Sequence, residues 1–211
     1  MDNQLKNLKV MAKANWAVVN PSSGSGNKTI NVSSSAEHTG RNARSTILNI
    51  TAANVEAKTV NVTQQGKPEF TNNNSDTATA VKGGQNVTIN GVSNSKKLTF
   101  SLGTGDLNIT LPTSYTAGGV TTANGAAING DPGATAQYNW SIVITVGENT
   151  TISSMSKQII VTDEGGNTDI CVLTQAAGDV YLSVSKTSIE LTYQGTAVSF
   201  NVESNTSWTI S

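Results

Sequence analysis

The sequence contains an internal repeat with a constant offset of 111 residues, and this repeat constrains the fold more than any other feature. The segment STILNITAANVEAKTVNVTQQG (45–66) aligns without a gap with SKQIIVTDEGGNTDICVLTQAA (156–177), so that Gln64 falls on Gln175. The same offset aligns pairs elsewhere in the chain: Pro21 with Pro132, Phe70 with Tyr181, Gly84 with Gly195, Val87 with Val198, Ile89 with Phe200, and Asn94 with Asn205. Several separate segments that share one offset indicate a duplicated unit.

The duplication predicts an unusual domain organisation. Residues 67–178 form one complete copy of the unit, whereas the other copy is split, with its front at 179–211 and its back at 1–66. In the order of the unit, the front of the split copy would be followed directly by MDNQLKNLKVMAKANW. About eleven residues, corresponding to SLGTGDLNITL (101–111), are missing at this join, and the arm QLKNLKVM could replace that strand.

Short runs of strand-forming residues alternate with turn sequences along the whole chain. In NWSIVITV, the apolar residues Trp140, Ile142, Ile144 and Val146 share one face of the predicted strand. Similar runs are KTINV, VTINGV, LTFSL, TVNV and DICVL, and the turn clusters include PSSGSGN, KGGQ, NGDPG and DEGGN. Turns at intervals of roughly 8–12 residues are typical of antiparallel sandwiches. We therefore predict an all-β protein with two Ig-like antiparallel β-sandwiches, one of them split between the chain termini.

Two stretches resemble the BACON domain, which is an Ig-like family. LSVSKTSIELTYQGTAVSFNVESNTSWTIS (182–211) resembles the front of that domain, whose pattern opens with L-S-V-x-P-x-S and runs to S-N-x-x-W. ANWAVVNPSSGSGNKTINV (14–32) and KTVNVTQQG (58–66) resemble its back half. Lys186 stands where the family usually has proline, and the copy at 67–178 keeps only the skeleton of the pattern. The family occurs in tandem in surface proteins and glycoside hydrolases of gut bacteria, where sugar or mucin binding has been proposed, and in virion proteins of crAss-like phages.

Half a sandwich is not stable alone, because its apolar sheet face and its strand edges lack partners. Three arrangements could complete the split copy: closure within one chain, strand exchange between neighbouring chains, or continuation in a longer tandem array. We predict that a set of apolar side chains meets at the completed interface: Ile30, Val32, Ile50, Val60, Val62, Tyr181, Val198, Phe200, Val202, Trp208 and Ile210.

The composition argues against several partner classes. The formal net charge is −1 and charged residues make up 13% of the chain, so that neither nucleic acid nor an anionic membrane surface is expected as a partner. No apolar run reaches the roughly 18–20 residues of a membrane span. The N-terminus MDNQLKNLKV lacks the features of a signal peptide. If the chain is the primary product, we expect a protein made and kept in the cytosol until it is released; if it is a mature fragment, the signal has been removed.

Residues that could carry chemistry are few, and we predict no catalytic, cofactor-binding or metal site. His38 is the only histidine and is expected in a loop, and Cys171 is the only cysteine and is expected in the core. The oxygen ligands of DEGGNTD (163–169) could chelate Ca²⁺, but a turn between two strands is the simpler interpretation. The carboxylates are scattered and show no glycosidase pair. Trp16, beside PSSGSGN, is the candidate glycan contact, although a packing role is also expected there.

These observations lead to two hypotheses on function. The first is a non-enzymatic virion structural protein of a crAss-like phage, assembled in the host cytoplasm as a capsid decoration, head fibre or tail component. Its partners would be copies of itself, other virion proteins and, through the family resemblance, host or mucin glycans. The second is a carbohydrate-binding or spacer module of a gut-bacterial surface protein, located at the cell surface.

Overall fold

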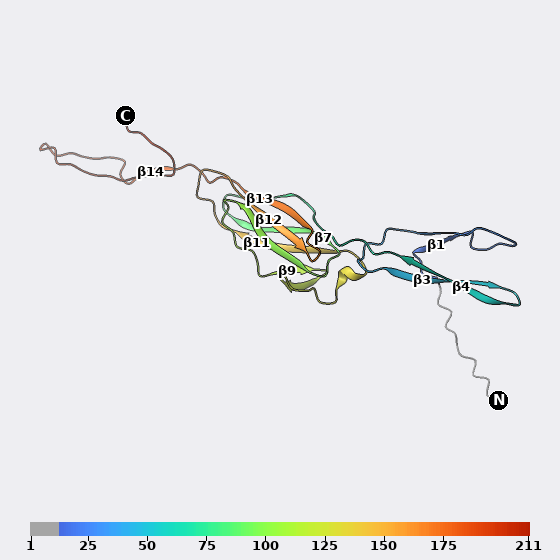
Figure 1. Cartoon of the computed structure of the whole chain (residues 1–211). Helices are drawn as coiled ribbons and strands as arrows, with labels where there is room; N and C mark the ends of the chain where they lie inside the picture. The colour runs from blue at the N-terminus through green and yellow to red at the C-terminus, as the bar shows by residue number, and fades with distance from the viewer. Residues whose placement is uncertain (1–12) are drawn as a thin grey trace.

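The computed structural model describes residues 13–211, and the predicted arm QLKNLKVM lies outside this range. The fold is all-β, as predicted, and its strands form several sheets that are mostly antiparallel. The molecule has three parts in a row (Figure 1), which we call the head half (residues 13–66), the central domain (67–178) and the tail half (179–211). The head half and the tail half project from opposite ends of the central domain.

The central domain is a sandwich of two sheets. One sheet has the strand order β10-β9-β11-β7-β5 and the other has the order β6-β13-β12-β8. All neighbours are antiparallel except β6 and β13, which pair in parallel. The strands are β5 (Thr71–Asn73), β6 (Thr77–Ala80), β7 (Gln85–Ser93), β8 (Leu98–Gly105), β9 (Ser114–Ala117), β10 (Val120–Ala123), β11 (Tyr138–Val146), β12 (Met155–Asp163) and β13 (Thr168–Gln175), with a 3-10 turn at Pro132–Ala134.

The core of the central domain lies between the two sheets and follows the alternation seen in the sequence. Trp140, Ile142 and Ile144 of β11 point inward and are fully buried. The Phe100 ring packs against the Trp140 ring edge-on, with ring centroids 5.2 Å apart, and against the Tyr115 ring at 5.1 Å. The strand NWSIVITV is predicted correctly from its pattern because buried apolar residues alternate along it with exposed or partly exposed residues.

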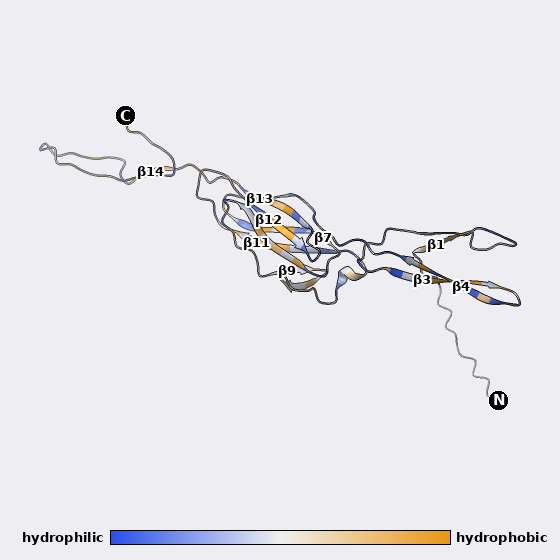
Figure 2. Cartoon of the chain, in the orientation of Figure 1, coloured by the Kyte–Doolittle hydropathy of each residue, from blue (hydrophilic) through white to orange (hydrophobic). Residues whose placement is uncertain are grey.

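The head half and the tail half consist of hairpins without a second sheet. The head half contains β1 (Ala17–Asn20) paired with β2 (Asn31–Ser34), and β3 (Arg44–Ala52) paired with β4 (Val55–Gln64). The tail half contains the short pair β14 (Leu182–Val184) and β15 (Val202–Ser204). The hydropathy colouring shows apolar residues along the hairpins of the head half as well as in the central sheets (Figure 2).

The backbone repeats at the same offset as the sequence. Strands β3 and β12 have bounds that differ by 111 residues at both ends, and so do β14 and β5. The pairing registers correspond as well: Arg44↔Gln64 matches Met155↔Gln175, and Leu182↔Ser204 matches Thr71↔Ser93. The head half therefore reproduces strands from the back of the central domain, and the tail half reproduces strands from its front.

The buried phenols of the central domain lead to a prediction about alkaline pH. Burial raises the pKa of Tyr138, whose hydroxyl donates to Ser95 O at 2.7 Å, and burial also raises the pKa of Tyr115. Because the folded state retains these protons more tightly, their contribution to stability is complete below the unfolded-state pKa of about 10 and is lost as the pH rises above it.

We expect the free energy of unfolding to fall above about pH 10, by up to roughly 1.4 kcal/mol per pH unit for each buried phenol. Urea unfolding at a series of pH values, followed by tryptophan fluorescence, measures this slope. The Tyr138→Phe variant should show a shallower slope than the wild type, and an unchanged slope would contradict the assignment.

Candidate functional site

The head half presents two hairpins whose apolar faces lack a covering sheet. In the central domain, the outer edge of β12 pairs with β8, the outer edge of β13 pairs with β6, and β11 pairs with β7. The counterparts β3 and β4 pair only with each other among the described residues, and β2 pairs only with β1. The head half therefore has open strand edges where the central domain is paired.

Apolar side chains that are buried in the central domain have exposed counterparts in the head half. Val161 and Cys171 are each 1% exposed in the central domain, whereas their counterparts Ile50 and Val60 in the head half are 56% and 47% exposed. Because these two side chains are about half exposed, each forfeits about half of the roughly 1.5–3 kcal/mol that full burial of an aliphatic side chain contributes. The head half thus has the strands of a sandwich without the burial that normally stabilises them.

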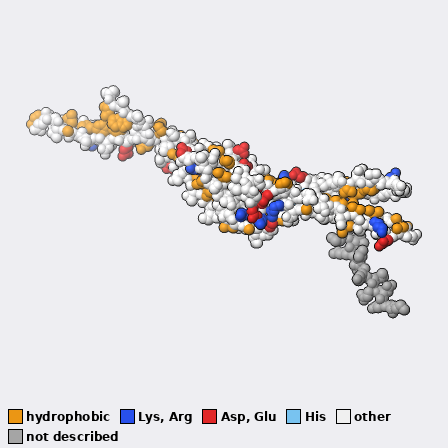
Figure 3. Space-filling model, viewed as in Figure 1, with side chains coloured by type: hydrophobic (Ala, Val, Ile, Leu, Met, Phe, Trp, Pro, Cys, Tyr) orange, Lys and Arg blue, Asp and Glu red, His pale blue; other side chains and the backbone are white. Residues whose placement is uncertain are grey.

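The tail half shows the same contrast in side-chain exposure with its counterpart in the central domain. Val87 and Ile89 on β7 are 6% and 4% exposed, whereas their counterparts Val198 and Phe200 are 41% and 39% exposed. The space-filling view shows hydrophobic side chains at the surface of both projecting parts (Figure 3). Both halves therefore expose side chains whose counterparts form the core of the central domain.

The predicted interface residues all fall on these two open parts. Most of them are exposed in the structure, and two are half-buried: the exposed ones are Ile30, Val32, Ile50, Val60, Tyr181, Val198, Phe200, Trp208 and Ile210, and the half-buried ones are Val62 and Val202. The structure gathers the first residues of this set on the head half and the last residues on the tail half. It does not bring the two groups together, because the halves lie at opposite ends of the molecule (Figure 1).

The offset does not hold for side-chain direction in every strand. At a shift of 111 residues the buried Ile142 and Ile144 correspond to Asn31 and Ser33, whereas the apolar residues at this place are Val32 in β2 and Ile30 just before it. Similarly, the buried Leu98 corresponds to Thr209, next to Trp208. At these two places the apolar residues of the open halves therefore lie one residue away from the positions that are buried in the central domain.

The small loops of the tail half repeat the hydrogen bonds of the central domain. The side chain of Asn94 accepts from Phe70 N at 3.0 Å and donates to Pro68 O at 3.2 Å. Its counterpart Asn205 accepts from Tyr181 N at 3.0 Å and donates to Asp179 O at 2.8 Å. The tail half therefore carries the local structure of the front of an Ig-like unit.

Gln64 is a candidate interface residue that is not among those predicted from the sequence. Its central counterpart, Gln175, is buried, and its Nε2 donates to Gly147 O at 2.6 Å, Val81 O at 3.2 Å and Lys82 O at 3.4 Å. Gln64 Nε2 donates to Ala36 O at 3.2 Å, which corresponds to the bond with Gly147. The alignment of Gln64 with Gln175 was the sequence signal for this role, because a glutamine conserved between copies inside an apolar strand has bonding partners.

His38 lies in a loop, as expected, and has a structural role there. Its Nε2 donates to Asn42 O at 2.7 Å, and the side chain is buried. The central counterpart is Asn149, whose Nδ2 donates to Ser153 O at 2.8 Å in the same relative position. His38 thus replaces an asparagine that holds the same loop together.

Arg41 fastens the head half to the central domain, a role that the sequence did not reveal. Its guanidinium donates to Asp131 Oδ2 and to Asn94 O, both at 2.6 Å. The bond to Asp131 raises the pKa of Arg41 further. Backbone bonds from Arg41 N to Gly133 O and from Asn42 N to Ala134 O, both 2.9 Å, complete the junction.

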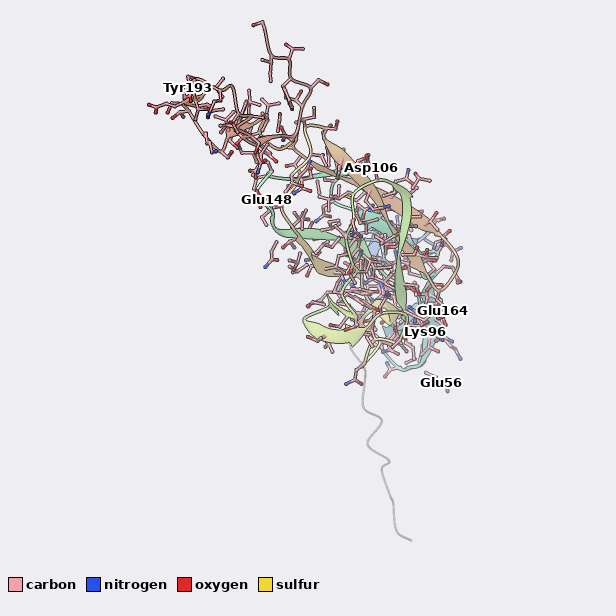
Figure 4. The ribbon with its side chains drawn as sticks, turned by 90° about the vertical axis from the view of Figure 1, so that its left-hand side faces the viewer. Glu56, Lys96, Asp106, Glu148, Glu164 and Tyr193 are labelled. Carbon is pink, nitrogen blue, oxygen red and sulfur yellow. The ribbon has the colours of Figure 1, made fainter. Side chains whose placement is uncertain are left out.

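The candidate calcium loop is a hydrogen-bonded turn. Asp163 is buried, and its two carboxylate oxygens accept from the backbone N–H and the side-chain amide of Asn167, both at 2.8 Å. Glu164 pairs with Lys96 at 3.2 Å, and the two labelled side chains lie close together in Figure 4. Within residues 13–211, no three His, Cys, Asp or Glu side chains are grouped so that they could hold a metal ion.

The remaining candidates are packed side chains. Cys171 is buried in β13, and burial raises the pKa of its thiol. Trp16 is half-buried, and the Arg44 guanidinium stacks over its ring at 4.8 Å from the centroid. Arg44 therefore covers one face of the ring that we considered as a glycan platform.

Comparisons with known proteins assign no family. No family model matches the chain, and no curated protein matches it. A solved structure of a protein from Bacteroides thetaiotaomicron is 15% identical with a TM-score of 0.27, covering 54% of this chain and 90% of that one. The collagen-binding domain of the Erysipelothrix rhusiopathiae surface protein RspB is 10% identical with a TM-score of 0.17, covering 71% of this chain and 64% of that one.

The part of the chain that the structure describes contains no helix that is both long enough and apolar enough to cross a membrane.

Trp140 and Trp208 differ in burial, so that replacing each with alanine tests the central domain and the two open halves separately. Trp140 is 2% exposed in the central domain, whereas Trp208 is 48% exposed in the tail half. We expect Trp140→Ala to destabilise the central domain by about 3–5 kcal/mol, as is typical for a buried aromatic. We expect Trp208→Ala to speed amide hydrogen exchange in the head and tail halves at least about tenfold and to spare residues 67–178. Equal changes in both regions, measured by hydrogen exchange, would contradict this division.

Proposed function

We propose that this protein is a non-enzymatic structural component whose Ig-like units interlock with those of neighbouring copies. The observation that supports this most directly is the arrangement of its open parts. The head half and the tail half are complementary portions of one unit, and they project from opposite ends of a complete domain (Figure 1). A contact between the head half of one copy and the tail half of the next is heterologous, so that it either closes into a ring or propagates.

The proposed setting is the virion of a crAss-like phage, as a capsid decoration, head fibre or tail component. The support for this setting is the resemblance of residues 182–211, 14–32 and 58–66 to BACON domains, which occur in such virion proteins. Interlocked modules suit a particle that must stay assembled after release from the host cell. The partners in this proposal are copies of the protein and other virion proteins, and glycans would be contacted by exposed surfaces of the assembled units.

The proposal includes no catalytic role. Charged side chains that lie close together serve as structural links: Arg41 with Asp131 at 2.6 Å joins two parts of the molecule, and Lys67 with Glu37 at 3.0 Å lies beside the same junction. The alternative, a carbohydrate-binding or spacer module of a gut-bacterial surface protein, would have the open halves completed by neighbouring repeats of a longer chain.

Light scattering coupled to gel filtration tests the proposal. The chain has a mass of 21.9 kDa, and we expect species of two or more copies whose average mass rises with concentration. Phe200→Asp should shift the distribution toward the single-chain mass, because it places a charge on the tail face that the neighbour must bury. Val143→Asp is the matched control, since Val143 is 50% exposed on the outer side of the central sheet.

A wild-type protein that stays at the mass of one chain at all concentrations would overturn the proposed function. Equal effects of Phe200→Asp and Val143→Asp would show that the association uses another surface.

A further inference from the structure

We infer that the tail half of one copy fills the head half of a second copy in the register of the central domain, with residues 188–191 added as a parallel strand to β4. This inference rests on the proposed function and specifies its interface. The central domain supplies the template, because β6 pairs in parallel with β13 through Val172↔Thr77 to Gln175↔Ala80. At the constant offset, this ladder becomes Asn61 to Gln64 of one copy against Ser188 to Leu191 of the other.

Hydrogen bonds of the buried Gln175 define the join more closely. Two of its acceptors, Val81 O and Lys82 O, belong to the front of the central unit. Their counterparts are Thr192 O and Tyr193 O on the tail half, which projects from the opposite end of the central domain to the head half that contains Gln64 (Figure 1). In the structure Gln64 Nε2 also donates to Ser34 Oγ at 3.0 Å. In the join, the N–H that bonds Ser34 turns to these two carbonyls of the next copy, while the bond to Ala36 O remains.

A backbone bond at the same place has its counterpart in the loop of His38. Asn149 N donates to Lys82 O at 2.8 Å in the central domain, and the corresponding pair is His38 N with Tyr193 O. The turn that presents these carbonyls is already formed in the tail half. Gly195 N donates to Thr192 O at 2.9 Å, and Gly195 has a positive φ of 71°. The equivalent turn at Gly84 has a φ of 80°.

Side-chain volumes at the proposed ladder change in opposite directions in the two halves. The head half has Val62 where the central domain has the larger Leu173, and the tail half has Leu191 in place of the buried Ala80. The smaller Val62 leaves room for the larger Leu191 when the two halves meet. Elsewhere both halves have larger residues than the central domain, with Ile50 and Val60 in place of Val161 and Cys171 and Phe200 in place of Ile89.

A second copy of this chain is the occupant that these observations favour. The tail half carries the strand pairing, the turn and the apolar face that the head half lacks, and within one molecule the two parts lie at opposite ends (Figure 1). Tyr193, at the tip of the tail half in Figure 4, is 96% exposed, which leaves the turn accessible to another molecule.

Cysteine pairing across the proposed ladder tests the register. Thr63 and Glu190 correspond to Thr174 and Thr79, which are direct partners with exposed side chains in the central domain. Paired strands lie about 4.8 Å apart, within the range for a disulfide. Thr63→Cys and Glu190→Cys chains are unfolded together, refolded as a mixture and oxidised, while Cys171 stays buried as in the wild type.

We expect a disulfide-linked dimer of the two variants on a non-reducing gel, with at least about tenfold less from either variant alone. Thr63→Cys mixed with Ser188→Cys is the matched control, because a displacement of two residues, roughly 7 Å along the strand, places the two Cα atoms roughly 8 Å apart, beyond the range for a disulfide. Gln64→Ala should weaken association by about tenfold or more, whereas substitution of the exposed neighbour in Gln65→Ala should leave it unchanged.

Each other outcome has a defined meaning. Equal or stronger linkage of Thr63→Cys to Ser188→Cys would overturn the register while the light-scattering result, and with it the proposed function, still stands. A chain carrying both Thr63→Cys and Glu190→Cys that yields only an internally linked monomer would show that the occupant is the chain's own tail half. Absence of multimers in the light-scattering experiment would overturn the proposed function and this inference together.

Discussion

The structure depends on one requirement of β-sandwiches: each sheet needs the other sheet to cover its apolar face. In the central domain this requirement is met, and Trp140, Phe100 and Leu173 are buried between the sheets. In the head and tail halves it is not met, although the strands and their registers are those of the same unit. The contrast arises within one chain, so that the intact copy serves as an internal standard for the split one.

Because the two halves of the unit are at opposite ends of the molecule, its two ends differ, and copies would associate head to tail. A chain with two complete units would consist of independently folded domains, and copies of it would associate only through surface contacts. Here each join would consist of a sandwich core, with apolar side chains worth about 1.5–3 kcal/mol each when buried. Association costs an estimated 4–15 kcal/mol in lost freedom, so a core of this kind offsets the cost where a small surface patch would not. Interlocking of this type resembles strand addition, in which main-chain bonds provide affinity and side-chain pockets provide specificity.

The fold class and much of the strand layout could be predicted from the sequence, because both the alternation of apolar and polar residues and the constant repeat offset reflect the course of the backbone. The bounds of β3 and the hairpin between β14 and β15 follow from the offset alone. The positions of the apolar residues at β2 do not, since Ile30 and Val32 lie one residue away from Asn31 and Ser33, the counterparts of the buried Ile142 and Ile144. The Arg41 junction was also beyond the sequence, because it joins loops whose proximity depends on how two successive units are oriented.

The junctions on either side of the central domain explain why the two halves project outward. At the head junction, Lys67 N donates to Gly40 O at 2.9 Å, and a Cβ on Gly66 would lie 1.9 Å from Arg41 O. At the tail junction, Gly178 N donates to Thr151 O at 2.7 Å, which is the same bond at the constant offset. Because both connections are fixed by backbone contacts, closure within one chain would require at least one of them to break. In the proposed assembly, a neighbouring copy would meet the open face with both junctions intact, and the repeated junction geometry would then set the angle from each unit to the next.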